Sequence, residues 1–360
     1  MAMSGGVDSS LAAARLKSDG YDVVGVTLHL WDYPDKGEKG RCCAPEDQYD
    51  ARRVCDSLGV PHFTFDRREL FHEHVVVPFV DAYLEGKTPS PCVACNRTVK
   101  LRELFPLADR LGAGFIATGH YARVVRERGR ARLYRARDLH KDQSYFLHML
   151  TELELSRLVL PLGELTKSEV RAEAVDRKLA GATKGESQEL CFVSSGTYAE
   201  FVAERADGRL RPGRIVDRDG REVGSHAGVH AFTLGQRKGI GVALGKPAFV
   251  TRIDAASRTV ELGDEGDLLA TGARLDAPVF APGVEPPFES VVRVRARHDG
   301  ERATVERDAS GGLVVRFVRP VRAVSPGQVA VFYDAGCEEV LGGATIVAPV
   351  AEPARPAAPS

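Results

Sequence analysis

The chain has 360 residues, of which 43% are hydrophobic, and this is enough apolar material for two or three folded domains. Its formal net charge of −1 provides no overall attraction for nucleic acid, so any basic surface must be local. The sequence shows no signal-peptide pattern and no long apolar run, which favours a cytoplasmic protein over a secreted or membrane-spanning one.

A glycine-rich loop opens the chain at residues 3–10, MSGGVDSS. Gly5 and Gly6 let the backbone approach a bound anion closely, and the following SSLAAARLKSDG has helical apolar spacing that stops at Gly20. The N-terminus of a helix carries unpaired N–H groups that suit phosphate. The loop lacks the Gly-Lys-Ser/Thr of a Walker A motif. Instead, SGGxDS resembles the PP-loop of the ATP pyrophosphatases, which cleave ATP to AMP and pyrophosphate.

Strands and helices alternate through the first half of the chain. We predict strands at 21–30, 61–66 and 114–118, and helices at 45–58 and 101–111. This order predicts an α/β doubly wound domain with a parallel sheet and a ligand at the carboxyl ends of its strands. Only residues 1–3 precede the loop, so the usual first strand is either shortened or begins upstream.

The composition changes near residue 205, where short alternating runs separated by Gly and Pro begin, among them GRIVDRDG, AFTLGQRKGIGV, PAFVTRID and TVELGD. Such runs predict short strands in two small β-rich, barrel-like domains. We therefore divide the chain into a nucleotide-binding and catalytic domain at 1–204, a central β-rich domain at 205–267, a barrel-like domain at 268–348 and a disordered Ala/Pro tail at 349–360.

Three of the seven cysteines are candidates for chemistry. Cys92 and Cys95 form a CxxC in SPCVACN, which suits a redox pair, half of a zinc site or cluster ligands. No second pair follows at zinc-finger spacing, so structural zinc is disfavoured. Cys191, in ESQELCFV, can join the other two only through the fold, and by itself it is typical of a small buried hydrophobic residue.

Seven ordered motifs between residue 2 and about residue 348 resemble those of the tRNA-specific 2-thiouridylases: SGGVDSS, TPSPCVACN, ATGHYAR, HKDQSYFL, ESQELCFV, FTLGQRKGI and SPGQVAVFY. These bacterial enzymes place sulfur on C2 of the wobble uridine of certain tRNAs. The resemblance implies a PP-loop ATPase domain followed by two β-rich domains, with tRNA and a sulfur donor, either a cysteine desulfurase or a sulfur-relay protein, as partners.

The resemblance also implies a set of ATP-binding residues: Ala2, Met3, Ser4, Gly5, Gly6, Val7, Asp8, Ser9, Leu28 and Gly119. The uridine C2 oxygen is a poor leaving group, and adenylation converts it into AMP, a good one. We expect Mg²⁺ to offset the phosphate charge, with Asp8 as a candidate to position the ion.

The family pattern gives the cysteines two alternative roles. In the first, Cys95 is the nucleophile and Cys191 carries the incoming sulfur as a persulfide, after which the two close a disulfide. A low thiol pKa is needed, and Arg97 and a helix expected to begin after Asn96 would lower it. Some family members carry Asp at the position of Cys92. In the second alternative, Cys92, Cys95 and Cys191 hold a [4Fe-4S] cluster with one iron open to sulfide.

The tRNA-binding residues that the resemblance implies are Ser90, Pro91, His120, Lys141, Asp142, Gln143, Arg295, Ala296 and Gln328. In RVRAR, the residues Arg293, Arg295 and Arg297 alternate, so we predict them on one strand face as a local phosphate-binding surface. Two other functions remain open at this point. One is a PP-loop ligase that acts on a small molecule, and the other is a non-catalytic RNA-binding protein.

Overall fold

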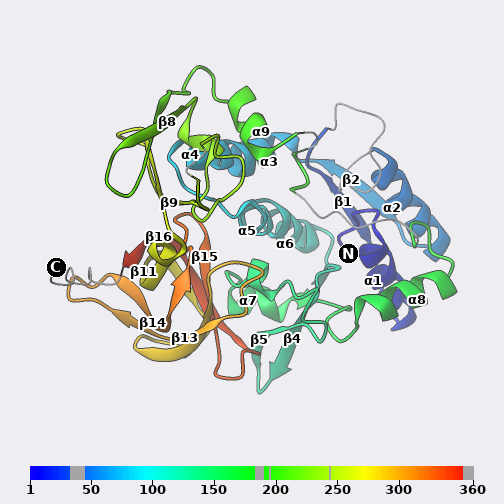
Figure 1. Cartoon of the computed structure of the whole chain (residues 1–360). Coiled ribbons are helices and arrows are strands. Elements are labelled where there is room, and N and C mark those ends of the chain that lie inside the picture. Colours follow the sequence, from blue (N-terminus) through cyan, green and yellow to red (C-terminus); the bar gives the residue numbers. More distant parts are fainter. Residues whose placement is uncertain (33–44, 183–189, 194–195, 243–244, 352–360) are drawn as a thin grey trace. The chain divides into compact units, whose positions relative to one another are not determined.

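The computed structural model describes residues 1–32, 45–182, 190–193, 196–242 and 245–351. The chain folds into two compact units (Figure 1). The first unit comprises Met1–Val76, Pro91–Ser195 and Glu338–Val340, and the second comprises Val77–Ser90, Gly196–Cys337 and Leu341–Ser360. The chain thus passes between the units several times. Among the described helices, none has the length and apolar character needed to cross a membrane.

A parallel sheet forms the centre of the first unit. In it β1 (Gly25–His29) pairs with β2 (His62–Asp66), and β3 (Ile116–Ala117) pairs with β6 (Leu158–Val159). Residues 1–3 join the two pairs, since the Ala2 amide donates to the Ala117 carbonyl and the Met3 amide donates to the Val26 carbonyl, each at 2.8 Å. The expected first strand is therefore present as a short central segment, and the predicted α/β doubly wound arrangement is confirmed.

The predicted helices form where the apolar spacing placed them. The helix predicted at 45–58 is α2 (Pro45–Leu58), and the one predicted at 101–111 is α6 (Leu101–Arg110). The loop runs into α1 (Val7–Ser18), whose small residues Ala12 and Ala13 are fully buried, which lets neighbouring elements pack closely. The remaining elements of this unit are α3 (Arg68–Phe71), η1 (His72–Val76), α5 (Pro91–Cys95), η2 (Asn96–Lys100), β4 (Ala122–Glu127), β5 (Arg130–Arg135), η3 (Ser144–Leu147), α7 (Glu152–Ser156) and α8 (Lys167–Asp176).

The second unit contains a four-stranded sheet with the order β8-β7-β10-β9. Its strands are β7 (Gly213–Val216), β8 (Glu222–His226), β9 (Phe249–Asp254) and β10 (Thr259–Gly263), and it is accompanied by α4 (Val77–Leu84), α9 (Tyr198–Glu204), η4 (Val229–Ala231) and η5 (Glu265–Leu268). The strand expected in AFTLGQRKGIGV is wrong. The segment forms turns because Gly235, Gly239 and Gly241 all have positive φ, a conformation that breaks a strand.

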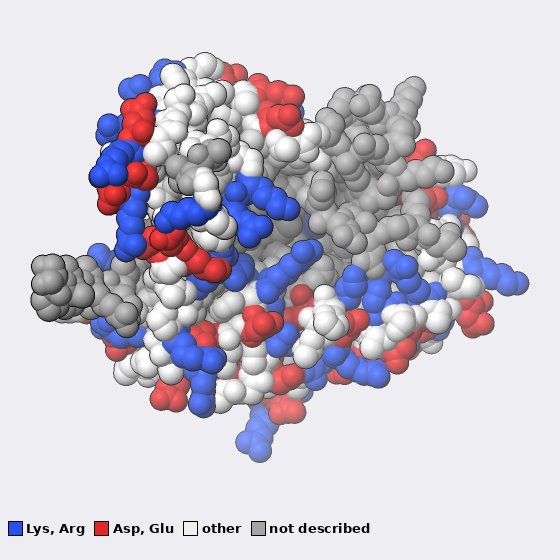
Figure 2. All heavy atoms as spheres, viewed as in Figure 1, with Lys and Arg blue, Asp and Glu red and all other residues white. Residues whose placement is uncertain are grey.

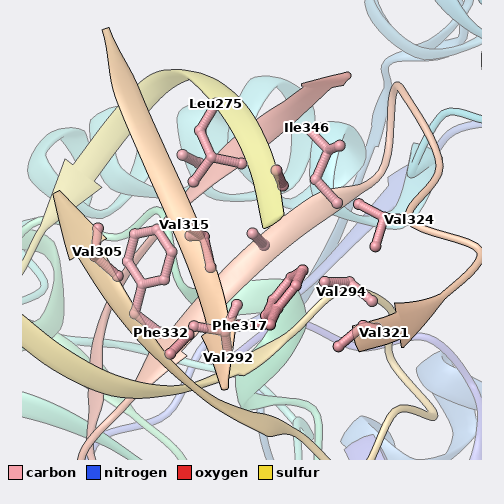
Figure 3. Packing of buried hydrophobic residues seen from close by; sticks show 14 of the residues in the cluster. Leu275, Val292, Val294, Val305, Val315, Phe317, Val321, Val324, Phe332 and Ile346 are labelled. Carbon is pink, nitrogen blue, oxygen red and sulfur yellow. The ribbon is translucent and has the colours of Figure 1, made fainter. Parts of the chain in front are cut away.

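A closed six-stranded barrel follows in the same unit, with the order β11-β14-β13-β12-β15-β16. Its interior is filled by alternating apolar residues such as Val292, Val315, Phe332 and Ile346 (Figure 3). The strands are β11 (Leu269–Phe280), β12 (Phe288–Arg293), β13 (Glu301–Arg307), β14 (Leu313–Arg322), β15 (Val329–Tyr333) and β16 (Val340–Ala351). The last strand continues past residue 348, and residues 352–360 of the expected tail lie outside the described part of the chain.

The predicted basic strand face in RVRAR is not formed. Strand β12 ends at Arg293, which is only 5% exposed. Its guanidinium donates to the carbonyls of Ala296 and His298, so it holds the turn after the strand. Arg295 donates to the Arg322 carbonyl at 3.1 Å, and Arg297 is exposed. The alternation failed as a guide because the chain turns directly after Arg293, where the His298 amide donates to the Arg295 carbonyl at 3.0 Å.

Candidate nucleotide loop and thiol pocket

The glycine-rich loop is fixed by its contact with α2. Gly5 has a φ of 74°, and a Cβ placed on it would lie 2.0 Å from the Asp47 carbonyl oxygen, so only glycine fits. The Ser9 hydroxyl donates to the Gly6 carbonyl at 3.1 Å, and the Ser10 amide makes the first helical hydrogen bond to the same carbonyl at 3.2 Å. The amides that precede Ser10 are those that a helix leaves without an intrahelical partner, as an anion site requires.

The predicted nucleotide residues divide into open and closely packed positions. A Cβ on Gly6 would meet only the Ser4 hydroxyl, at 3.6 Å, so the space beside Gly6 is open. In contrast, a Cβ on Gly119 would lie 3.0 Å from the Ser9 nitrogen, which puts Gly119 directly against the loop. Ala2 and Met3 use their amides within the sheet and therefore position the loop. Leu28 lies next to the carboxyl end of β1, on the sheet edge where ligands of such folds bind.

Asp8 is held by two residues that were not predicted from the sequence. The Lys167 ammonium donates to both carboxylate oxygens, at 2.6 and 2.8 Å, and the Tyr121 hydroxyl donates to one of them at 2.7 Å. Lys167 is only 9% exposed although it is charged. The sequence did contain a signal for Lys167. Thr166 and Glu169 form a capping box, so Lys167 occupies the first position of α8. A positive charge at the N-terminus of a helix is unfavourable, and a lysine there therefore indicates a nearby negative partner.

The three candidate cysteines line one pocket of about 130 Å³ in the first unit. Cys92 is exposed, Cys95 is 6% exposed, and Cys191 is half-buried. The other lining residues are Phe71, Val75, Pro91, Asn96, Lys100, His120, Gln143, Phe146, Leu190 and Phe192. The fold therefore brings Cys191 to the CxxC, which no spacing in the sequence could establish.

Cys95 lies inside a continuous helical run. Helix α5 begins at Pro91, passes into the π-helical η2 (Asn96–Lys100), and continues as α6. The expected helix start after Asn96 is therefore wrong, because the segment after Cys95 contains no residue that breaks a helix. Cys95 therefore lies at the end of α5, whereas Cys92 is the cysteine in the first turn of this helix. Insertions of this π-helical kind are frequent at functional sites.

An aromatic cluster positions Cys191. The Phe192 ring, which is 2% exposed, packs edge-on against Phe71 at 5.7 Å and against Trp31 at 6.3 Å between ring centroids. These contacts hold the residue beside Cys191 against helix α3 and against the segment that follows β1. Because each aromatic side chain buries a large apolar area, the cluster stabilises the end of the segment that carries the thiol.

His120 follows β3, which ends at Ala117, and lines the thiol pocket. Burial, and secondarily the positive charge of Lys100, lower the pKa of His120 to about 3, so its imidazole is neutral at physiological pH. Its Nδ1 is 2.8 Å from the Thr118 hydroxyl. Gly119 touches the nucleotide loop, His120 lines the pocket, and Tyr121 donates to Asp8, so three consecutive residues join the two sites.

The junction at Gly119–Tyr121 is held in place by the segment 141–143. The Asp142 side chain is fully buried; it pairs with Arg135 at 3.0 Å and accepts hydrogen bonds from the Ala136 and Ser144 amides. Gln143 lines the pocket and accepts a hydrogen bond from the Tyr121 amide at 2.9 Å. Lys141 is half-buried. The structure therefore gives Asp142 an internal, organising position.

Of the other residues predicted to contact tRNA, Pro91 belongs to the first unit and lines the thiol pocket, and the rest belong to the second unit: Ser90, Arg295, Ala296 and Gln328. The Gln328 amide donates to the carbonyls of Thr88 and Pro89, each at 3.0 Å, and so holds the residues that precede Ser90 and Pro91. Ala296 accepts a hydrogen bond from Arg293. Figure 2 shows Lys and Arg side chains interspersed with Asp and Glu on the viewed face, in keeping with the near-zero net charge.

The sequence also implied a [4Fe-4S] cluster held by Cys92, Cys95 and Cys191. Although the three cysteines share a pocket, no group of three or more His, Cys, Asp or Glu side chains among the described residues is arranged to hold a metal ion. The described residues therefore provide no ligand set for a metal ion at the three thiols, and no step is assigned to a cluster.

Family models match most of the chain: a tRNA methyl transferase HUP domain over residues 1–195, a tRNA methyl transferase PRC-barrel domain over 199–264 and an aminomethyltransferase beta-barrel domain over 272–346. The model names refer to methyl transfer, whereas the curated relatives are named as tRNA-specific 2-thiouridylases. One from Sorangium cellulosum is 68% identical over 97% of this chain and 91% of its own, and one from a Roseiflexus species is 44% identical over 96% and 98%. A pocket with three thiols agrees with the latter name, and the chain belongs to the tRNA-specific 2-thiouridylase family.

Proposed function

We propose that this protein thiolates C2 of the wobble uridine of tRNA and consumes ATP to do so. The observation that carries the proposal is the junction at Gly119–Tyr121, where a PP-loop and a pocket with three thiols meet in one unit. A reaction that couples ATP cleavage to sulfur transfer needs these two sites side by side. A ligase for small molecules would need the loop but would have no use for the thiols. Because its substrate is tRNA, we place the enzyme in the cytoplasm.

In the activation step, the pyrophosphate of ATP lies against the amides at the start of α1, beside the open position of Gly6. ATP enters as its Mg²⁺ complex, in which the phosphates carry the ion. The uridine O2 attacks the α-phosphorus, so an O–P bond forms, pyrophosphate leaves, and the N3 proton passes to water. A proton returns to N3 when the thiocarbonyl is released. Lys167 supplies a fixed positive charge next to this loop, since its ammonium is held by Asp8. We therefore assign charge compensation to Lys167 and give Asp8 the role of holding it.

In the sulfur step, we assign Cys191 as the persulfide carrier and Cys95 as the thiol that resolves it. The terminal sulfur of the Cys191 persulfide attacks the activated C2, and AMP leaves with the former O2 oxygen. The Cys95 thiolate then attacks the Cys191 sulfur, which forms a Cys95–Cys191 disulfide and releases the thiocarbonyl. A thiol reductant restores both cysteines, and a sulfur-donor protein reloads Cys191. The alternative in which sulfide is delivered through a cluster lacks a suitable ligand arrangement among the described residues.

For RNA binding, we propose that His120 and Gln143 contact the target nucleotide, because both line the thiol pocket. Ser90, Pro91, Lys141, Arg295 and Ala296 remain candidates for tRNA contact. Asp142 and Gln328 are proposed to act indirectly, since their polar atoms hold neighbouring backbone groups. The target base must leave its stack to enter a pocket of this kind.

The test is mass spectrometry of wobble uridine in tRNA incubated with the protein, ATP and a sulfur donor. We expect 2-thiouridine together with stoichiometric AMP, and loss of thiolation in Cys95→Ser and Cys191→Ser. Cys337→Ser is the matched control, because Cys337 lies in a turn of the second unit and should not affect the reaction. If AMP forms without tRNA and a small molecule is modified instead, the chain is a different PP-loop ligase.

Cys92→Ser separates the two forms of sulfur chemistry. With a persulfide, this variant retains substantial activity, and anaerobically purified protein contains no iron. With a cluster, the variant loses iron, colour and activity together, because each ligand is needed for the integrity of the cluster. Anaerobic handling is required, since air destroys exposed clusters and would imitate the first outcome.

A further inference from the structure

Asn96 is a buried amide in the wall of the thiol pocket, and its acceptor atom is not satisfied. The residue is 3% exposed, and it lines the pocket together with Cys95 and Cys191. Its Nδ2 donates to the Phe146 carbonyl oxygen at 3.3 Å. Its Oδ1 is buried and has no hydrogen-bond partner among the described residues. Buried polar atoms are nearly always paired in native proteins, so an orphan acceptor at a pocket points to a ligand that donates.

The two arms of the amide are not interchangeable. An exchange of the oxygen and nitrogen would place Oδ1 against the Phe146 carbonyl, and two acceptors would then face each other. The hydrogen bond to the Phe146 carbonyl therefore fixes the position of Nδ2, and Oδ1 is the amide atom that remains available to accept a hydrogen bond. Asn96 also lies in the π-helical η2, directly after Cys95, so its side chain is tied to the position of that thiol.

The pocket is small, at about 130 Å³, compared with the roughly 300–1,000 Å³ of pockets that enclose drug-sized ligands. It therefore suits a single ring or part of one. On a uracil ring, N3–H is the donor immediately beside C2, the atom that receives sulfur. A base that presents C2 to Cys95 and Cys191 thus brings its only ring donor next to the reacting carbon, toward the residue that follows Cys95.

We propose that Asn96 Oδ1 accepts the N3–H of the target uracil and thereby selects uridine; this inference rests on the proposed function. Cytosine carries an acceptor at N3, so it would set two acceptors against each other in a water-poor pocket. A site built to receive a hydrogen bond rejects strongly the analogue that lacks the donor, because its own buried group is left unpaired. Asn96 is thus a specificity residue for the base, whereas affinity for the tRNA as a whole comes from its backbone contacts.

The experiment combines one change in the protein with one change in the RNA. Wild type and Asn96→Ala are each given tRNA with uridine or with 3-methyluridine at the wobble position, and kcat/KM is measured by mass spectrometry of the thiolated base. In wild type, we expect the methyl group to lower kcat/KM by about 10- to 100-fold. In Asn96→Ala, the same methyl group should cost about 10-fold less than it costs in wild type. The contact is already gone in this variant, and the cost of activating a base that has no N3 proton to release is common to both proteins.

Val75→Ala is the matched control, because Val75 lines the same pocket and its truncation makes room without removing an acceptor. It should retain the full penalty for the methyl group, and all three proteins should bind tRNA within about 2-fold of one another. An equal methyl penalty in wild type and Asn96→Ala would overturn the proposal, as would an equal relief of that penalty by Val75→Ala. Equal thiolation of both RNAs by wild type would overturn it without any variant. A wild type that thiolates neither RNA would instead refute the proposed function.

Discussion

At the scale of single residues, the two glycines of the nucleotide loop have different tasks. Gly5 has a positive φ, and its missing side chain makes room for the Asp47 carbonyl, so its requirement is internal to the protein. Gly6 has an ordinary φ of −86° and open space beside it, so its requirement concerns the ligand. Both look equivalent in the sequence SGG. The distinction depends on α2, which lies far along the chain.

We expect Gly6→Val to abolish AMP formation, because the new side chain fills ligand space. It should lower the melting temperature less than Gly5→Ala does, because a Cβ on Gly6 meets only the Ser4 hydroxyl, at 3.6 Å. Gly5→Ala should instead lower the free energy of unfolding by about 1–3 kcal/mol or more, since it adds strain and a clash. Thermal unfolding and AMP release measured on both variants check this. Normal ATP turnover in Gly6→Val would refute the PP-loop assignment.

A second prediction at this scale concerns pH. Burial first, opposed by the hydrogen bond to the Tyr145 carbonyl, lowers the pKa of His148 to about 4, and His148 is 6% exposed. An unfolded histidine has a pKa of about 6.5. Between pH 6.5 and pH 4, the imidazole is therefore protonated in the unfolded chain and neutral in the folded protein. Stability from this group is therefore full above pH 6.5 and is lost as the pH falls toward 4.

From pH 8 to pH 5, His148 alone should lower the free energy of unfolding by about 2 kcal/mol. Other buried histidines, such as His120, act in the same direction. Denaturant unfolding across this pH range measures the loss, and His148→Gln should reduce it. The exposed His140→Gln serves as the control. A pH profile of His148→Gln that matches wild type would contradict the assignment.

At the scale of elements, local patterns predicted the helices and most strands because each follows from its own spacing. The helix at 45–58 is an example: Pro45 starts it, and Gly59 follows its end. The segment RVRAR shows where such patterns fail. Arginines at every second position predict a strand face, but this spacing does not reveal that the chain turns after Arg293. The same limit applies to Cys191, whose partners in the pocket are set by packing between elements distant in sequence.

The arginines after β12 provide a test of the revised element boundary. Arg295→Gln and Arg297→Gln should leave the fold intact, and each phosphate contact removed should reduce the slope of log K against log salt for tRNA binding by about 1. Arg293→Gln should instead destabilise the barrel by about 1–3 kcal/mol, since Arg293 is buried and holds two carbonyls. Salt-dependent filter binding and thermal unfolding separate the two classes. Unchanged stability of Arg293→Gln would contradict its structural role.

At the scale of the whole molecule, the compact units do not follow the order of the sequence. Residues 77–90 lie between two parts of the first unit in sequence, yet they belong to the second. In that unit Tyr83 stacks on Tyr198 at 4.7 Å, and Phe79 packs against Phe201 at 6.2 Å between ring centroids. No local signal indicates such an excursion, because α4 looks like any other amphipathic helix. Our domain limits remain a prediction for this reason.

We expect a fragment of residues 1–195 to bind a hydrophobic dye and to aggregate, although a family model ends at that residue. The fragment retains Phe79 and Tyr83, which are 1% and 6% exposed in the whole chain, but loses their partners. A fragment in which 77–90 is replaced by a Gly/Ser linker of equal length should bind less dye. Dye fluorescence and size-exclusion chromatography compare the two. A soluble, cooperatively melting unmodified fragment would show that the excursion is dispensable.

The hold of Gln328 on Thr88 and Pro89 has a consequence for synthesis on the ribosome. The two ends of this contact are 240 residues apart. At about 5–20 residues per second, the glutamine is made roughly 12 to 48 s after the backbone it secures. During that interval the segment that leads to the CxxC lacks the two hydrogen bonds from Gln328. A nascent or prematurely ended chain therefore carries Cys92 and Cys95 directly after a segment that is held less firmly. The backbone at Thr88 and Pro89 is therefore anchored only after translation has passed residue 328 of the barrel domain.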